Sequence, residues 1–296
     1  MIQIIDTCAQ IPSLFEDGCF SLEKWEAYIN AIYAQSANRF KKDLKRMLDS
    51  GSYTYEKDIL PILHAVPRHP ALENLQRSFQ WVTAGLNERI ANGFGRVVDV
   101  DIVLYMGLCN AAGWVTHINN RDVILLGVEK ILELGWDDTD SLYGLIYHEL
   151  GHVYHNQHGK LKQHSNDSSR NFVWQLFTEG VAMYFEQVLV NDLAYYHQNK
   201  NGWQTWCEEH FRQILADFHT DLLTMTPHNQ RYFGDWVKYN GRSDVGYYLG
   251  ARFVQHLCER YRFEQLIQMH LEDVYQEYLV YVEKENKHFG TKGPLV

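Results

Sequence analysis

The chain has 296 residues, of which 46% are hydrophobic and 14% aromatic, with 27 Lys and Arg against 37 Asp and Glu. This hydrophobic content excludes a disordered or collagen-like chain and predicts a large buried core. The net charge of −10 argues against a nucleic-acid partner or an anionic membrane, because phosphate contacts need clustered lysines and arginines. We expect a soluble, acidic, globular protein of unknown oligomeric state.

The five cysteines are scattered and form no Cys-x-x-Cys pair, which argues against a disulfide framework and against a thiolate zinc site. The first residues lack the basic and apolar regions of a secretory signal. No uninterrupted run of about 18 apolar residues occurs either, as a membrane span would need. These observations favour a cytoplasmic protein with no membrane partner.

The N-terminal third is predicted to be helical. Residues 21–48 place aromatic and aliphatic side chains on one helical stripe, and Gly51 follows its basic last turn. Residues 71–92 predict a second helix that ends at Asn92-Gly93. Gly93-Phe94-Gly95 is too short for a phosphate-binding loop and is interpreted as a turn. Residues 1–95 are therefore expected to form a helical layer.

The middle of the chain changes to β-branched, alternating segments. Residues 96–106, 112–118 and 122–126 predict strands, with a turn at Asn119-Asn120. The remainder predicts helices at about 140–158, 172–190, 204–224, 245–261 and 264–284. A small mixed sheet among helices indicates a mostly helical α+β fold, and we expect residues 1–296 to form one domain.

The helix predicted over 140–158 contains the motif His148-Glu149-Leu-Gly-His152. Two histidines four residues apart lie on the same helix face, so that both imidazoles can bind one Zn²⁺ ion. Glu149 then lies beside the ion, where it can act as general base toward a water molecule. A chance occurrence on a solvated helix surface is the alternative, and a third ligand would decide against it.

Glu179 is the candidate third ligand. It lies among apolar residues of the next helix, where an unpaired carboxylate is costly and a metal ion would compensate its charge. Gly180 beside it allows that helix to pack closely. The alternative is an ordinary surface glutamate.

With these residues the chain resembles a gluzincin, the branch of zincin metallopeptidases that adds a Glu to the two motif histidines. It is more closely similar to poorly characterised bacterial proteins known as predicted zinc-dependent proteases. The similar segments are Ala112 to Thr116, Leu126-Gly127, Glu129 to Ile131, His148 to His152, Thr178 to Gly180 and Gly246 to Gly250. The resemblance implies a zincin-like catalytic core at 96–260, between the helical region 1–95 and a C-terminal helical extension at 261–296.

The sequence departs from the metzincin pattern HExxHxxGxxH. His158 stands at the position of the third metzincin ligand, but His155 replaces the glycine that would let the helix stop there. We therefore prefer Glu179 to His158. His155, His158 and His164 are interpreted as polar residues around the helix end, although His155 lies on the motif face and could support a ligand.

A metallopeptidase also needs a hydrogen-bond donor for the oxyanion of the tetrahedral intermediate. Tyr247 is favoured by the resemblance. Tyr248, Arg252 and His256 on the same predicted helix remain open alternatives.

These residues predict a zinc-dependent peptide-bond hydrolase that acts on a peptide or protein, with Glu149 and Tyr247 as catalytic residues. Strand addition of substrate is expected at 112–118 or 122–126. A catalytically inactive zincin scaffold used for binding or regulation is the alternative, and a helical interaction protein with a chance motif is another. The choice between endo- and exopeptidase stays open.

Overall fold

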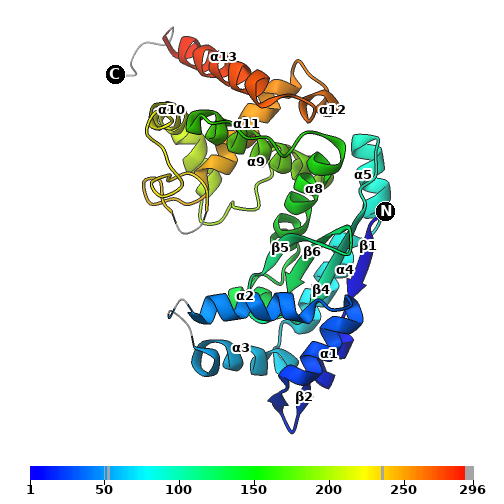
Figure 1. Ribbon diagram of the computed structural model, residues 1–296. Helices are drawn as coiled ribbons and strands as arrows, with labels where there is room; N and C mark the ends of the chain where they lie inside the picture. The colour runs from blue at the N-terminus through cyan, green and yellow to red at the C-terminus, as the bar shows by residue number, and fades with distance from the viewer. Residues whose placement is uncertain (50, 52–53, 235–236, 291–296) are drawn as a thin grey trace. The chain divides into compact units, whose positions relative to one another are not determined.

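The computed structural model describes residues 1–49, 51, 54–234 and 237–290 (Figure 1). The chain divides into two compact units, Met1–Glu149 and Leu150–Val296. The division falls inside the helical segment that carries the HExxH motif. The expected single domain with ranges 1–95, 96–260 and 261–296 stays a prediction, and neither internal limit coincides with this division.

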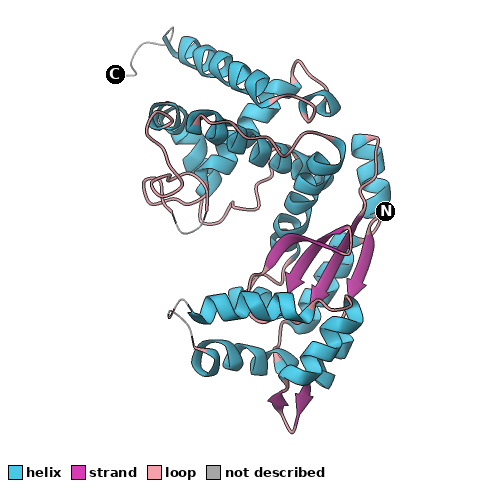
Figure 2. Cartoon of the chain, in the orientation of Figure 1, coloured by secondary structure: helices cyan, strands magenta, loops and turns pink. Residues whose placement is uncertain are grey.

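The first unit contains a four-stranded mixed sheet in the order β1-β4-β6-β5 (Figure 2). β1 (Gln3–Asp6), β4 (Val100–Tyr105) and β6 (Arg121–Gly127) are parallel, and β5 (Gly113–Ile118) is antiparallel to β6. Every residue of β4 is buried, as expected for a central parallel strand with both faces covered. The predicted α+β class with a small mixed sheet is confirmed.

The turn between β5 and β6 forms where the sequence predicts it. Asn119 and Asn120 have φ angles of 50° and 62°, the left-handed conformation that a type I′ hairpin turn requires. β5 lies at the edge of the sheet, whereas β6 has neighbours on both sides. Of the two segments expected to offer a free edge, only 112–118 does so.

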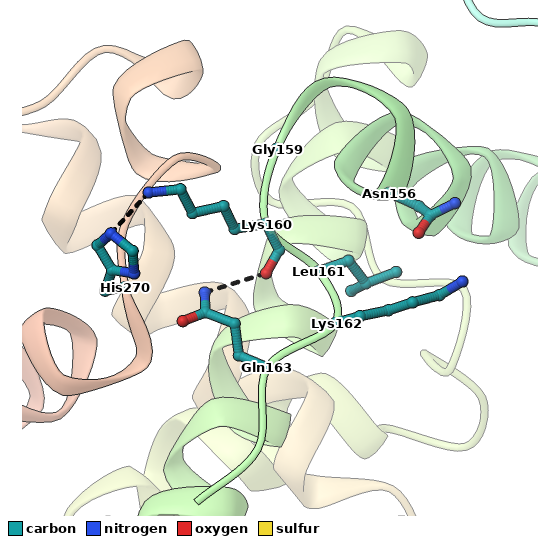
Figure 3. A pocket seen from close by; sticks show the side chains of 7 residues that line it. All are labelled: Asn156, Gly159, Lys160, Leu161, Lys162, Gln163 and His270. Carbon is teal, nitrogen blue, oxygen red and sulfur yellow. Dashed lines mark hydrogen bonds between the residues drawn. The ribbon is translucent and has the colours of Figure 1, made fainter.

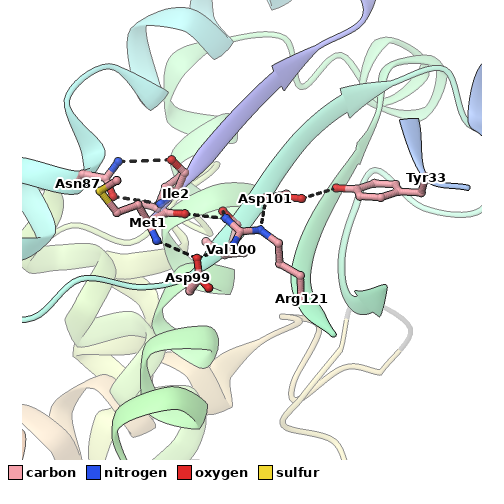
Figure 4. A network of polar contacts seen from close by, with 8 residues as sticks. All are labelled: Met1, Ile2, Tyr33, Asn87, Asp99, Val100, Asp101 and Arg121. Atoms are coloured by element: carbon pink, nitrogen blue, oxygen red, sulfur yellow. Dashed lines mark hydrogen bonds and ion pairs between the residues drawn. The ribbon is translucent and has the colours of Figure 1, made fainter. Parts of the chain in front are cut away.

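The first strand was not predicted, and it corrects the view of residues 1–95 as a purely helical layer. β1 pairs with β4 about 100 residues away, with Gln3 opposite Asp101. Arg121 binds the carboxylates of both Asp99 and Asp101 at this end of the sheet, and Asp101 also accepts from the Tyr33 hydroxyl at 2.9 Å (Figure 4). These contacts hold this end of the sheet in place. No local sequence pattern predicts them.

The N-terminal helices are shorter than predicted. The segment 21–48 is broken between Ile32 and Ala37, where the Asn30 side chain accepts from the Ala37 N–H at 3.1 Å. The segment 71–92 is broken at Gly85, whose φ of 65° ends the helical path, and its second part continues to Phe94. The helices of this unit are α1 (Leu22–Ile32), α2 (Ala37–Asp49), α3 (Leu60–Ala65), α4 (Leu72–Thr83), α5 (Leu86–Phe94), α6 (Val128–Leu134) and α7 (Thr139–Tyr143). A two-stranded hairpin, β2 (Phe15–Glu16) with β3 (Cys19–Phe20), precedes them.

The second unit is helical throughout its described elements. It consists of α8 (Glu149–His158), whose first residue ends the first unit, followed by α9 (Ser168–Val190), α10 (Trp203–Asp221), α11 (Val245–Cys258), α12 (Phe263–Leu266) and α13 (Leu271–Gly290). The predicted helix 264–284 is therefore two helices. α9 and α11 pack through glycines: a Cβ atom on Gly180 would lie 2.2 Å from the Gly250 carbonyl oxygen. The close approach expected at Gly180 is confirmed.

Two further expectations concern the cysteines and the membrane. All five cysteines are free thiols in the structure. None of the described helices combines the length and the apolar character needed to cross a membrane.

Candidate metal centre

The helical segment that carries the motif begins with a capped turn. Asp138 accepts from the Ser141 N–H at 2.9 Å, which satisfies an otherwise unpaired donor at the start of α7. The segment then widens into a π-helical turn over Gly144–His148 and returns to α-helical geometry in α8. Such π-turns are often found at functional sites. Here the wide turn ends at the first histidine of the motif.

His152 and Glu179 meet within the second unit. His152 Nε2 lies 3.2 Å from a Glu179 carboxylate oxygen, and the two side chains are 21% and 17% exposed. His148 precedes His152 by one helical turn, and the ligand atoms of all three residues lie within 4.8 Å of one another. Ligands 2.0–2.1 Å from a tetrahedral zinc ion would be separated by about 3.4 Å. The three side chains therefore form a candidate group for holding one ion.

Small residues explain why α8 lies against α9. A Cβ atom on Gly151 would be 2.7 Å from the Ala182 Cα atom, so that only glycine permits this helix contact. The contact holds His152 beside Glu179, which precedes Ala182 by one turn of α9. The glycine inside the motif thus has a packing role that the motif alone does not reveal.

Glu149 follows His148 directly and is half-buried. It belongs to neither of the two ligand groups found among the described residues. Its expected place beside the ion stays a prediction. Its role as general base stays a prediction.

A second group was missed by the sequence analysis. Glu186 is fully buried, and its two carboxylate oxygens lie 3.0 and 2.9 Å from His197 Nδ1. Ligand atoms of Glu186, His197 and His148 also lie within 4.8 Å of one another. Glu186 follows Glu179 by seven residues, two helical turns, and this spacing was a usable signal. His197 lies in a loop after α9, where no periodicity could indicate it.

The candidate oxyanion donors have different surroundings. Tyr247 is half-buried, and its ring centroid lies 6.5 Å from that of His197. Tyr248 is only 1% exposed and packs against Tyr196, Trp203 and Phe211, and burial raises the pKa of its hydroxyl. Tyr248 is therefore a core aromatic residue.

The two remaining alternatives on α11 have other contacts. The Arg252 guanidinium lies over the Phe211 ring at 5.4 Å. His256 stacks on Tyr281 and lies 3.2 Å from the Lys284 ammonium. These contacts favour packing roles for both residues.

The prediction that His155 is a polar residue at the helix end is wrong. Its side chain is fully buried against Trp174 and Phe177. Burial, followed by the nearby His152, lowers its pKa to about 3, so that it is neutral. His158 instead packs edge-on against Tyr154, and the described residues do not place it in either ligand group. The metzincin-like ligand set is therefore not assembled.

The first unit contains another buried carboxylate, Glu129, which is 1% exposed. It accepts hydrogen bonds from the backbone N–H groups of Gly107 and Cys109 at 2.8 and 2.9 Å. Burial raises its pKa to about 6. Glu129 holds the loop between β4 and β5 and belongs to neither ligand group.

Comparisons with known proteins give no match to a family model, to a curated protein or to a solved structure. The resemblance to gluzincins therefore depends on the residues quoted above.

Proposed function

We propose that this protein is a zinc-dependent peptide-bond hydrolase whose ion is held by His148, His152 and Glu179. The observation that carries the proposal is the grouping of these three ligand atoms within 4.8 Å. Two imidazoles and one carboxylate are a ligand set that catalytic zinc sites use, with a further position left open for water or substrate.

Bound zinc would supply a Lewis acid for the substrate carbonyl and would make water a better nucleophile at neutral pH. Glu149, next to the ligand His148, would take a proton from the attacking water and deliver it to the leaving amine. An inactive binding scaffold would not require this base.

Tyr247 would donate a hydrogen bond to the oxyanion, and His197 is a second candidate for this role. Glu186 holds His197 through Nδ1 and so fixes the orientation of its ring. The ring centroids of His197 and Tyr247 are 6.5 Å apart, so the two candidate hydrogen-bond donors lie close to each other.

Substrate backbone would add to the sheet at β5. The Ala112 carbonyl accepts from Gly127 N–H, so that the polar backbone groups of Gly113 and Val115 alternate toward the open edge. A Cβ atom on Gly113 would be 3.0 Å from the Leu145 side chain, which places the start of β5 against the turn before His148. The protein would thus act on an extended peptide in the cytoplasm.

The test is hydrolysis of an unfolded protein substrate by the purified chain and by Glu149→Gln. We expect this variant to keep its zinc and its melting temperature and to lose activity by several orders of magnitude, because only the base is removed. Zinc binding without hydrolysis in the parent chain would instead favour the inactive scaffold. Equal activity of parent and variant would contradict the proposed mechanism.

A further inference from the structure

A pocket rich in hydrogen-bond donors lies where α8 ends. It has a volume of about 350 Å³ and is lined by residues 159–163 together with Asn156 and His270 (Figure 3). This volume suits a small ligand. Although the chain has a net charge of −10, none of the described residues that line the pocket is acidic. The pocket shares no residue with the candidate metal centre.

The walls of the pocket are fastened to each other. The Lys160 N–H donates to the Ile267 carbonyl at 2.8 Å. The Gln163 amide donates to the Lys160 and Met269 carbonyls, both at 3.0 Å, and accepts from the Leu271 N–H at 2.9 Å. The segment before α9 and the segment before α13 are therefore held together, and the pocket is preformed.

The pocket offers mainly donors and positive charge. Lys160 Nζ lies 2.7 Å from His270 Nε2, and because an ammonium group can only donate, the second nitrogen of His270 carries its proton. Lys162 adds a second ammonium group. Within the described part of the chain, the backbone N–H groups of Leu161 and Lys162 have no hydrogen-bond partner.

Two carbonyl acceptors of this segment are already used. The Lys160 carbonyl accepts from the Gln163 side chain, and the Leu161 carbonyl accepts from the Gln163 N–H at 3.2 Å. Ammonium groups combined with unpaired backbone N–H groups are what an oxyanion needs, because each donor is matched by a lone pair and the charges attract.

We propose that this pocket binds the anionic group of a small molecule, either a phosphate or a carboxylate. The site is independent of the proposed hydrolysis. Its cationic groups are Lys160 and Lys162 on one short segment, and His270 on the other wall accepts from the Lys160 ammonium.

The experiment is calorimetric titration of the full chain with inorganic phosphate and, separately, with citrate, at constant ionic strength. We expect saturable binding of at least one anion, and the tighter of the two identifies the preferred group. Lys160→Gln should weaken that binding about tenfold or more, because a charged hydrogen bond is lost. Lys238→Gln removes the same charge from an exposed lysine outside the pocket and should leave the affinity unchanged.

Each titration is repeated with added zinc. Equal affinity with and without zinc supports a site separate from the metal centre, whereas binding that appears only with zinc would overturn the proposal. The absence of saturable binding for both anions would also overturn it. So would an equal loss of affinity in Lys160→Gln and Lys238→Gln, because this would indicate general electrostatic attraction.

Discussion

Buried carboxylates in the two units differ in their partners. In Met1–Glu149, Glu129 is 1% exposed and accepts from two backbone N–H groups, so that its oxygens are used to hold a loop. In Leu150–Val296, Glu186 is also fully buried, but its partner is the imidazole of His197, and Glu179 lies 3.2 Å from the imidazole of His152.

Burial alone therefore does not identify a functional carboxylate. A carboxylate that accepts from backbone N–H groups is held in a structural role. A carboxylate beside an imidazole can instead bind a metal ion, or it can orient the imidazole toward a substrate. On this basis we expect changes at Glu179 and Glu186 to act on metal binding and catalysis, and changes at Glu129 to act on stability.

The largest effect is expected for the ligands. Glu179→Gln and His152→Ala should each lower zinc affinity by several orders of magnitude, because a direct bond to the ion is lost. Glu186→Gln should lower it far less, because Glu186 holds His197, which lies outside the proposed ligand set. Zinc affinity is measured by competition with a chelating dye, and Glu209→Gln, at an exposed position of α10, is the control. Loss of zinc from Glu186→Gln but not from Glu179→Gln would show that the second group is the metal site.

The next largest effect is expected for the oxyanion donors. Tyr247→Phe and His197→Ala should lower turnover about 10²–10³-fold for whichever residue is the donor, with little change in zinc content. Tyr248→Phe is the matched control, because this core residue should affect melting temperature more than turnover. Full turnover in both Tyr247→Phe and His197→Ala would remove both residues from the mechanism.

A smaller effect is expected from Glu129. Its pKa is raised from 4.5 to about 6 in the folded chain, so that the folded state binds its proton more tightly than the unfolded state. The stabilising contribution is therefore complete below pH 4.5 and is lost as the pH rises through 6. The loss should amount to about 2 kcal/mol in the free energy of unfolding.

This prediction is checked by urea unfolding at a series of pH values for the parent chain and for Glu129→Gln. The difference between the two free energies of unfolding should change between pH 4.5 and 6, because the variant has no group to titrate there. Parallel pH dependences would show that Glu129 has an ordinary pKa in the folded chain.

Local patterns allowed part of the fold and site to be predicted. The motif helix and Glu179 were accessible because helical periodicity and residue spacing are local properties. β1 was not, since its pairing with β4 depends on residues about 100 positions apart. His197 was missed for the same reason: a loop brings it back to Glu186, and loops carry no period. Two long helices were predicted where the described residues form four. Gly85 interrupts one segment, and in the other the Asn30 side chain accepts from the backbone N–H of Ala37, the first residue of α2.

His148, His152 and Glu179 are proposed to hold one zinc ion. The most direct test is elemental analysis of the full chain purified without chelator and dialysed to remove loosely bound metal. We expect about one zinc per chain, and a strongly reduced content in Glu179→Gln analysed in parallel. A parent chain that contains no zinc and takes up none when it is supplied would contradict the account.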